Sequence, residues 1–96
     1  MIDLKRYVAD VPDFDRFLTV DEINAAFAQI AADHPDISSI KRVGSSTLGD
    51  PIPMLTIGSG SKNALLFGCP HPNEPIGALM LHYLAGLLIR DADLRD

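Results

Sequence analysis

Cysteine and aromatic residues are scarce in this sequence of 96 residues. Cys69 is the only cysteine, so no disulfide forms within the chain, and such cysteine usage fits a reducing compartment. The chain has no tryptophan and only 2 tyrosines, so we expect no aromatic binding platform. Hydrophobic residues nevertheless make up 47% of the chain, which is typical of a small globular domain and excludes a disordered one.

Basic residues and long hydrophobic runs are also lacking. The chain has 8 Lys and Arg against 13 Asp and Glu and no basic patch, so we expect neither nucleic acid nor a membrane surface as a partner. Residues 1–15 lack the apolar run of a signal peptide. Residues 76–89 are interrupted by His82 and are too short to span a bilayer. These absences predict a soluble, cytoplasmic protein.

The clearest expected element is a helix that follows an irregular N-terminal arm over residues 1–18. Thr19 and Glu22 have the spacing of a capping box, with Thr19 as N-cap. Apolar residues then recur at helical spacing at Val20, Ile23, Phe27, Ile30 and Ala31. Pro35 ends this pattern, so the sequence predicts a helix that stops near His34.

Three strands are expected after this helix. Residues 37–43 and 52–57 flank a turn-rich segment and predict an antiparallel pair, and Pro53 indicates that the second strand lies near a sheet edge. Residues 64–67 form a continuous apolar run, typical of a strand buried on both faces. Because such a strand requires two neighbours, we expect an α/β domain cut short, whose incomplete sheet edge offers a route to self-association.

A second helix is expected to begin at Glu74, with Asn73 as N-cap and Pro75 in the first turn. It is apolar on most sides, which predicts extensive burial of Leu79, Met80, Tyr83, Leu84, Leu87 and Leu88. Residues 90–96, with three aspartates, are expected to form a polar, solvent-exposed segment after this helix.

His71 and Glu74 are the candidate metal ligands. They lie between the expected buried strand and the second helix, where ligands bind in open α/β sheets, and zinc accepts both imidazole nitrogen and carboxylate oxygen. Pro70, Pro72 and Pro75 would stiffen the segment. The alternative is that Glu74 only favours the helix N-terminus while His71 is an exposed loop residue, and the spacing alone does not separate the two.

Other reactive side chains have simpler explanations. Cys69 is close to the pair and could be a ligand or nucleophile, but a single free cysteine beside a buried strand is more often a core residue. His82 is expected in the helix core and His34 at a helix end. No Gly-x-Ser-x-Gly motif is present, which argues against a serine hydrolase.

Two longer segments resemble the zinc carboxypeptidase family. Residues 43–58 resemble its first hairpin, where a Gly-x-Ser-x-x-Gly-Arg turn joins two strands, and here read Gly-Ser-Ser-Thr-Leu-Gly-Asp from Gly44 to Asp50. Residues 67–77, Phe-Gly-Cys-Pro-His-Pro-Asn-Glu-Pro-Ile-Gly, resemble the strand, loop and helix that carry the family's His-x-x-Glu zinc pair. Together with the opening helix, the resemblance extends in order from residue 18 to about residue 90.

The resemblance implies a three-layer α/β/α fold with a mixed sheet, of which residues 19–96 form an incomplete N-terminal part. It implies that His71 and Glu74 bind zinc, with a third histidine ligand, a glutamate base and substrate-binding arginines much later in the family sequence. Zinc would activate a water molecule to hydrolyse a C-terminal peptide bond. No catalytic residue other than the metal pair has a counterpart here, so we expect this chain alone to be inactive.

Two alternatives concern the substrate and the activity. Asn73 stands where many peptide-cleaving members have arginine, and the related deacylases of the succinylglutamate desuccinylase and aspartoacylase type commonly read His-Gly-Asn-Glu there. The substrate is therefore expected to be either a peptide or a small acyl amino acid. The other alternative is a non-catalytic interaction module in which His71 and Glu74 are vestigial.

Overall fold

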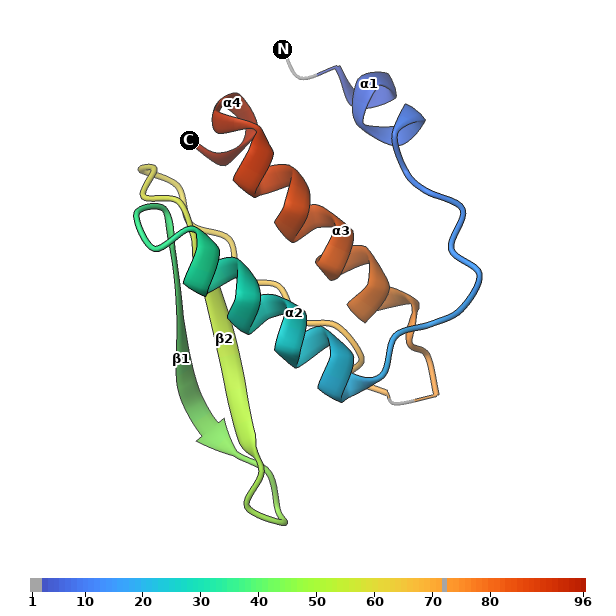
Figure 1. The fold of residues 1–96 in the computed structure, drawn as a ribbon, viewed down its shortest axis with the longest axis vertical. Helices are drawn as coiled ribbons and strands as arrows, with labels where there is room; N and C mark the ends of the chain where they lie inside the picture. Colours follow the sequence, from blue (N-terminus) through green and yellow to red (C-terminus); the bar gives the residue numbers. More distant parts are fainter. Residues whose placement is uncertain (1–2, 72) are drawn as a thin grey trace.

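The structure, a computed structural model, describes residues 3–71 and 73–96. Its described part is a small mixed α/β arrangement in which a two-stranded antiparallel sheet is accompanied by helices (Figure 1). The elements follow one another as α1 (Leu4–Ala9), α2 (Val20–Asp33), β1 (Ser38–Ser45), β2 (Pro51–Ile57), α3 (Ile76–Arg90) and α4 (Ala92–Arg95). Helix α2 contacts both strands, and α3 contacts α2 and β2.

The start of α2 is as predicted, because local side chains satisfy its free amides. The Glu22 amide donates to Thr19 Oγ1 at 3.1 Å, and the Thr19 amide donates to Glu22 Oε1 at 2.9 Å. Ile23, one turn into the helix, belongs to the small buried core. The capping box therefore sets the boundary between the arm and the helix.

The predicted antiparallel hairpin is also confirmed. Ser38 pairs with Ile57 and Ser45 with Pro51, and the register shifts between Arg42 and Gly44. The connecting turn includes Gly49, whose φ of 90° is readily adopted only by glycine. In Figure 1 this turn projects beyond the helices, at the end of the molecule opposite α1 and α4.

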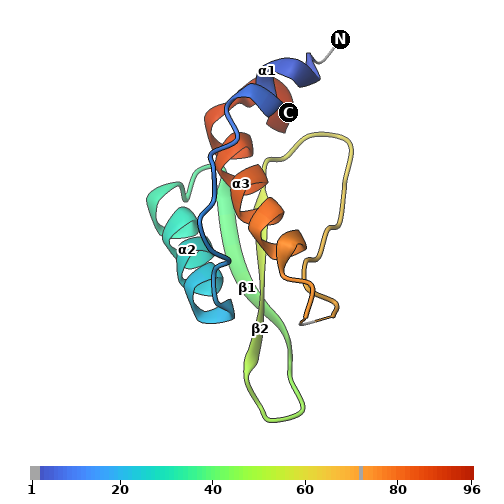
Figure 2. The ribbon, with the colours of Figure 1, turned by 90° about the vertical axis from the view of Figure 1, so that its right-hand side faces the viewer.

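The expected third strand is not formed, and this prediction was wrong. Residues 64–67 belong to an irregular segment between β2 and α3, and Leu65 and Phe67 are 77% and 76% exposed. A strand needs a neighbour for its backbone N–H and C=O groups, and the sheet of the described residues contains only β1 and β2. Figure 2 shows this segment running along the side of the molecule before α3 returns beside it.

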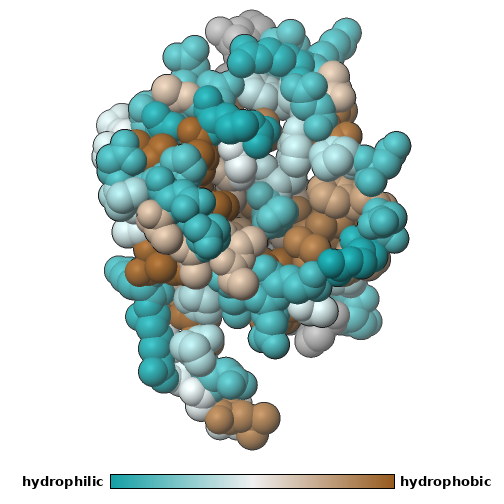
Figure 3. Space-filling view, viewed as in Figure 1, coloured by the Kyte–Doolittle hydropathy of each residue, from teal (hydrophilic) through white to brown (hydrophobic). Residues whose placement is uncertain are grey.

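Helix α3 begins at Ile76, two residues later than predicted. Pro75 occupies the N-cap position without a side-chain cap, so Asn73 is not the cap and Glu74 precedes the helix. Burial is also less than expected, because Leu79 is buried but Met80 is 57% exposed. Figure 3 shows hydrophobic side chains at the surface of the molecule, which is consistent with a sheet and a helix that lack full cover.

The N-terminal arm contains a short helix where an irregular segment was expected. Helix α1 is held by contacts with α3. Tyr7 Oη donates to Oδ2 of Asp91, the C-cap of α3, at 2.8 Å, and Tyr83 Oη, from the middle of α3, donates to the Tyr7 carbonyl oxygen at 3.2 Å. Asp91 Oδ1 also accepts from the Leu94 amide and caps α4. The expectation that residues 90–96 form only a polar, solvent-exposed segment after the helix was therefore wrong for Asp91.

None of the helices in the described part of the chain has the combination of length and hydrophobicity that crossing a lipid bilayer requires.

Candidate metal centre

The loop that carries His71 and Glu74 starts at a close contact between two backbone segments. The backbone of Gly68 lies directly against the first turn of α3, at Gly77 and Ala78. The next residue, Cys69, has a φ of 57°, the left-handed conformation that residues with a side chain rarely adopt. The loop thus leaves its preceding segment with a sharp change of direction before it reaches His71.

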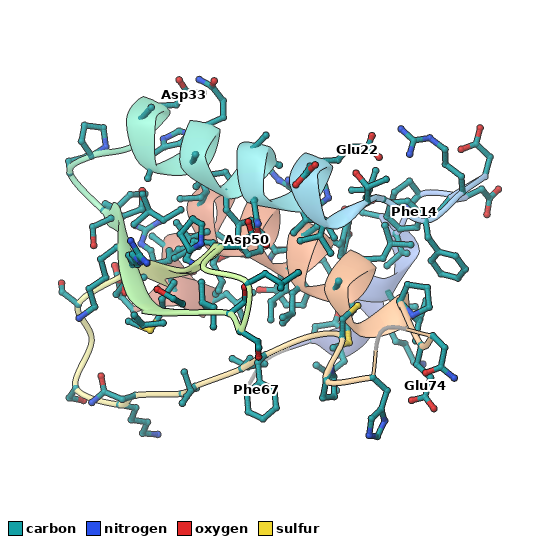
Figure 4. All side chains as sticks on the ribbon, turned by 90° about the horizontal axis from the view of Figure 1, so that it is seen from below. Phe14, Glu22, Asp33, Asp50, Phe67 and Glu74 are labelled. Atoms are coloured by element: carbon teal, nitrogen blue, oxygen red, sulfur yellow. The ribbon has the colours of Figure 1, made fainter. Side chains whose placement is uncertain are left out.

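His71 and Glu74 lie on one tight turn in front of α3. The Glu74 amide donates to the His71 carbonyl oxygen at 3.0 Å, and His71 Nδ1 lies 3.7 Å from Glu74 Oε2. Both side chains are mostly exposed, at 72% for His71 and 67% for Glu74. Figure 4 shows Glu74 beyond the start of α3, pointing away from the body of the molecule.

The donor pair suits zinc. Two ligands of one tetrahedral zinc ion, each bound at about 2.0–2.2 Å, lie roughly 3.3–3.5 Å apart. The observed 3.7 Å between His71 Nδ1 and Glu74 Oε2 is slightly longer than this separation, so the side chains would have to rotate for both atoms to reach one ion. Because both side chains are exposed, the remaining coordination positions would face solvent and be open to further ligands.

A complete metal site is not present in the part of the chain that the structure describes, where no group of three or more His, Cys, Asp or Glu side chains is arranged to hold an ion. Cys69 forms no such group with the pair in the described residues, and its Sγ lies 3.9 Å from the Glu74 carbonyl oxygen. Pro72, expected to stiffen the loop, lies outside the described residues.

Glu22, the other glutamate of the chain, and His34 lie in separate contacts away from this loop. Arg16 donates to both carboxylate oxygens of Glu22 at 2.9 and 2.7 Å. These bonds, and to a smaller extent the bond from the Thr19 amide, lower the pKa of Glu22 to about 2. A carboxylate with so low a pKa is unsuited to act as a general base. His34 is the C-cap of α2, where its amide donates to the Ile30 carbonyl oxygen, as its expected position at a helix end implies.

Sequence reasoning missed the residues that shape the loop. The close approach of Gly68 to α3 and the left-handed Cys69 both depend on where α3 packs. The available signal was the pair of glycines, Gly68 and Gly77, on either side of the His-x-x-Glu motif. Glycine has no Cβ atom and therefore permits a close approach of two backbone segments.

A comparison with protein families confirms the resemblance found in the sequence. A family model described as zinc carboxypeptidase matches residues 23–95, which extend from the first turn of α2 to the end of α4 and include both His71 and Glu74. No curated protein sequence matches the chain.

Proposed function

Because the chain belongs to the zinc carboxypeptidase family, we propose that His71 and Glu74 are zinc ligands of a metallocarboxypeptidase that hydrolyses a C-terminal peptide bond. The observation that carries this proposal is the 3.7 Å separation of His71 Nδ1 and Glu74 Oε2 on one exposed turn within the matched residues. We further propose that residues 19–96 form the N-terminal part of a three-layer α/β/α domain, after the arm of residues 1–18.

Each residue of the pair has a distinct role in this proposal. His71 supplies a neutral nitrogen ligand, and Glu74 supplies an anionic oxygen that offsets part of the charge of the ion. When bound, zinc polarises the carbonyl group of the scissile bond and lowers the pKa of a bound water molecule. The exposure of both side chains leaves room for a substrate and for the additional ligand and base that hydrolysis requires.

Zinc binding by the full chain tests the proposal. Isothermal titration with zinc alone should give binding that weakens at least tenfold in His71→Ala and in Glu74→Ala, because each variant removes one of two ligands. His82→Ala, which changes a histidine within α3, is the matched control and should bind as the wild type does. Equal affinity in His71→Ala and the wild type would reject the metal pair and favour a non-catalytic interaction module.

A deacylase that cleaves small acyl amino acids is the second candidate. Asn73 is exposed in the turn between the two proposed ligands, where an arginine would add a positive charge beside the ion. Because this chain alone is expected to be inactive, binding separates the two candidates better than cleavage. Titration of the zinc-loaded protein with a hippuryl peptide and with an N-acyl amino acid compares the two substrate classes. Tighter binding of the peptide supports the carboxypeptidase, and tighter binding of the acyl amino acid supports the deacylase.

A further inference from the structure

The contact between Gly68 and α3 leaves no space for a side chain at residue 68. A Cβ atom built on Gly68 would lie 2.7 Å from the Ala78 nitrogen and 2.8 Å from both Ala78 Cα and the Gly77 carbonyl carbon. All three are backbone atoms at the start of a helix, so no side-chain rotation relieves the overlap. The loop segment and α3 would have to separate to admit even a methyl group.

The same contact is less restrictive when seen from the helix. A Cβ atom on Gly77 would lie 3.5 Å from Gly68 Cα and 3.6 Å from the Cys69 nitrogen, which are ordinary van der Waals distances. A methyl group is therefore excluded on one side of the contact and accepted on the other. Gly68→Ala and Gly77→Ala therefore add the same methyl group to opposite sides of one contact, and only Gly68→Ala should disturb it.

Cys69 fixes the direction in which the loop continues. Its φ of 57° lies in the left-handed region, which is disfavoured for a residue with a side chain. Its Sγ lies 3.9 Å from the Glu74 carbonyl oxygen, so the residue links the start of the loop to its end. The His71 carbonyl oxygen and the Glu74 amide form the second link within the same loop, at 3.0 Å.

The backbone, rather than side-chain packing, sets the separation of the proposed zinc ligands, because His71 and Glu74 are 72% and 67% exposed. We infer that Gly68 and Cys69 are positioning residues for this pair, holding His71 and Glu74 at a separation suited to one metal ion. The inference rests on the proposed zinc-binding function. Preorganised ligands lose less conformational freedom on binding, so displacement of the loop weakens metal binding even when both ligands remain.

The decisive comparison is between Gly68→Ala and Gly77→Ala in the full chain. Titration with zinc alone at one pH should give a dissociation constant at least tenfold higher for Gly68→Ala, and one within twofold of the wild type for Gly77→Ala. The circular dichroism spectrum and melting temperature of each variant establish that the affinity is measured on folded protein. Equal zinc affinity in folded Gly68→Ala and the wild type would overturn the inference while the proposed function stands.

Variants of Cys69 keep the inference testable if Gly68→Ala does not fold. Asparagine adopts the left-handed conformation more readily than other residues with a side chain, whereas β-branched valine disfavours it. Cys69→Asn should therefore keep zinc affinity within threefold of the wild type, and Cys69→Val should lose at least fivefold. Equal losses in both variants would overturn the positioning role and assign the effect to the thiol. A wild-type chain that binds no zinc would reject the proposed function and the inference together.

Discussion

At the scale of single residues, Glu22 joins the N-terminal arm to the first long helix. Its carboxylate accepts two hydrogen bonds from Arg16 and one from the Thr19 amide. Arg16, which precedes the helix, is thereby tied to the cap of α2. The hydrogen bonds from Arg16 have the largest effect, and the bond from the Thr19 amide has the next largest. Together they lower the pKa of Glu22 from its usual 4.5 to about 2.

This lowered pKa predicts how the contribution of Glu22 to stability depends on pH. Because the folded pKa lies below the unfolded one, the contribution is fully present above about pH 4.5 and is lost as the pH falls towards 2. In urea unfolding between pH 7 and 2, the difference in free energy between the wild type and Glu22→Gln should therefore shrink with falling pH. Asp21→Asn, in the same first turn, is the control. A difference that does not change over this range would contradict the assignment.

At the scale of elements, Asp91 connects the distant helix α1 to the junction between α3 and α4. It is the C-cap of α3 and the N-cap of α4, and its Oδ2 atom accepts from Tyr7 of α1 at 2.8 Å. Arg6 of α1 pairs with the same oxygen at 3.1 Å. One carboxylate, of which 13% of the side-chain surface is exposed, thus holds the N-terminal arm against the end of α3.

Removal of this carboxylate should release the arm. We predict that Asp91→Ala increases the rate of trypsin cleavage after Lys5 and Arg6 several-fold. The substitution removes both the ion pair with Arg6 and the hydrogen bond from Tyr7. Tyr7→Phe, which keeps the aromatic ring and removes one hydrogen bond, should have a smaller effect. Asp93→Ala changes a neighbouring carboxylate in α4 and serves as the control. Unchanged cleavage in Asp91→Ala would show that other contacts hold the arm.

At the scale of the whole molecule, the sheet and its hydrophobic neighbours are incompletely covered. The described residues form a sheet of two strands, so each strand has a free edge. Leu65 and Phe67 expose most of their surface beside this sheet and α3. Leu65 also lines an open pocket of about 390 Å³ between β2, α3 and the irregular segment.

Such a surface favours association between copies of the chain. We predict that the apparent mass of the isolated 96-residue chain rises with concentration in light-scattering measurements, because association removes exposed apolar surface and free strand edges from water. Phe67→Lys should lower this association. Leu48→Lys, at the hairpin turn where the side chain is already 91% exposed, is the control. A single mass of 10.4 kDa at all concentrations would contradict the prediction.

The sequence by itself determined the elements whose interactions are local. The capping box between Thr19 and Glu22 and the hairpin between β1 and β2 both involve residues close together along the chain. Hydrogen bonds of this kind need no distant partner. Helical spacing and turn residues therefore indicated these features.

The tertiary structure decided what depends on distant neighbours. Residues 64–67 have the composition of a buried strand, but a strand forms only where another strand satisfies its backbone groups. Helix α1 is held by Asp91, which is 84 residues beyond Tyr7, so no local pattern could reveal that contact. The geometry of the loop before α3 likewise depends on the packing of Gly68 against Ala78, because backbone proximity between separate segments is a property of the fold.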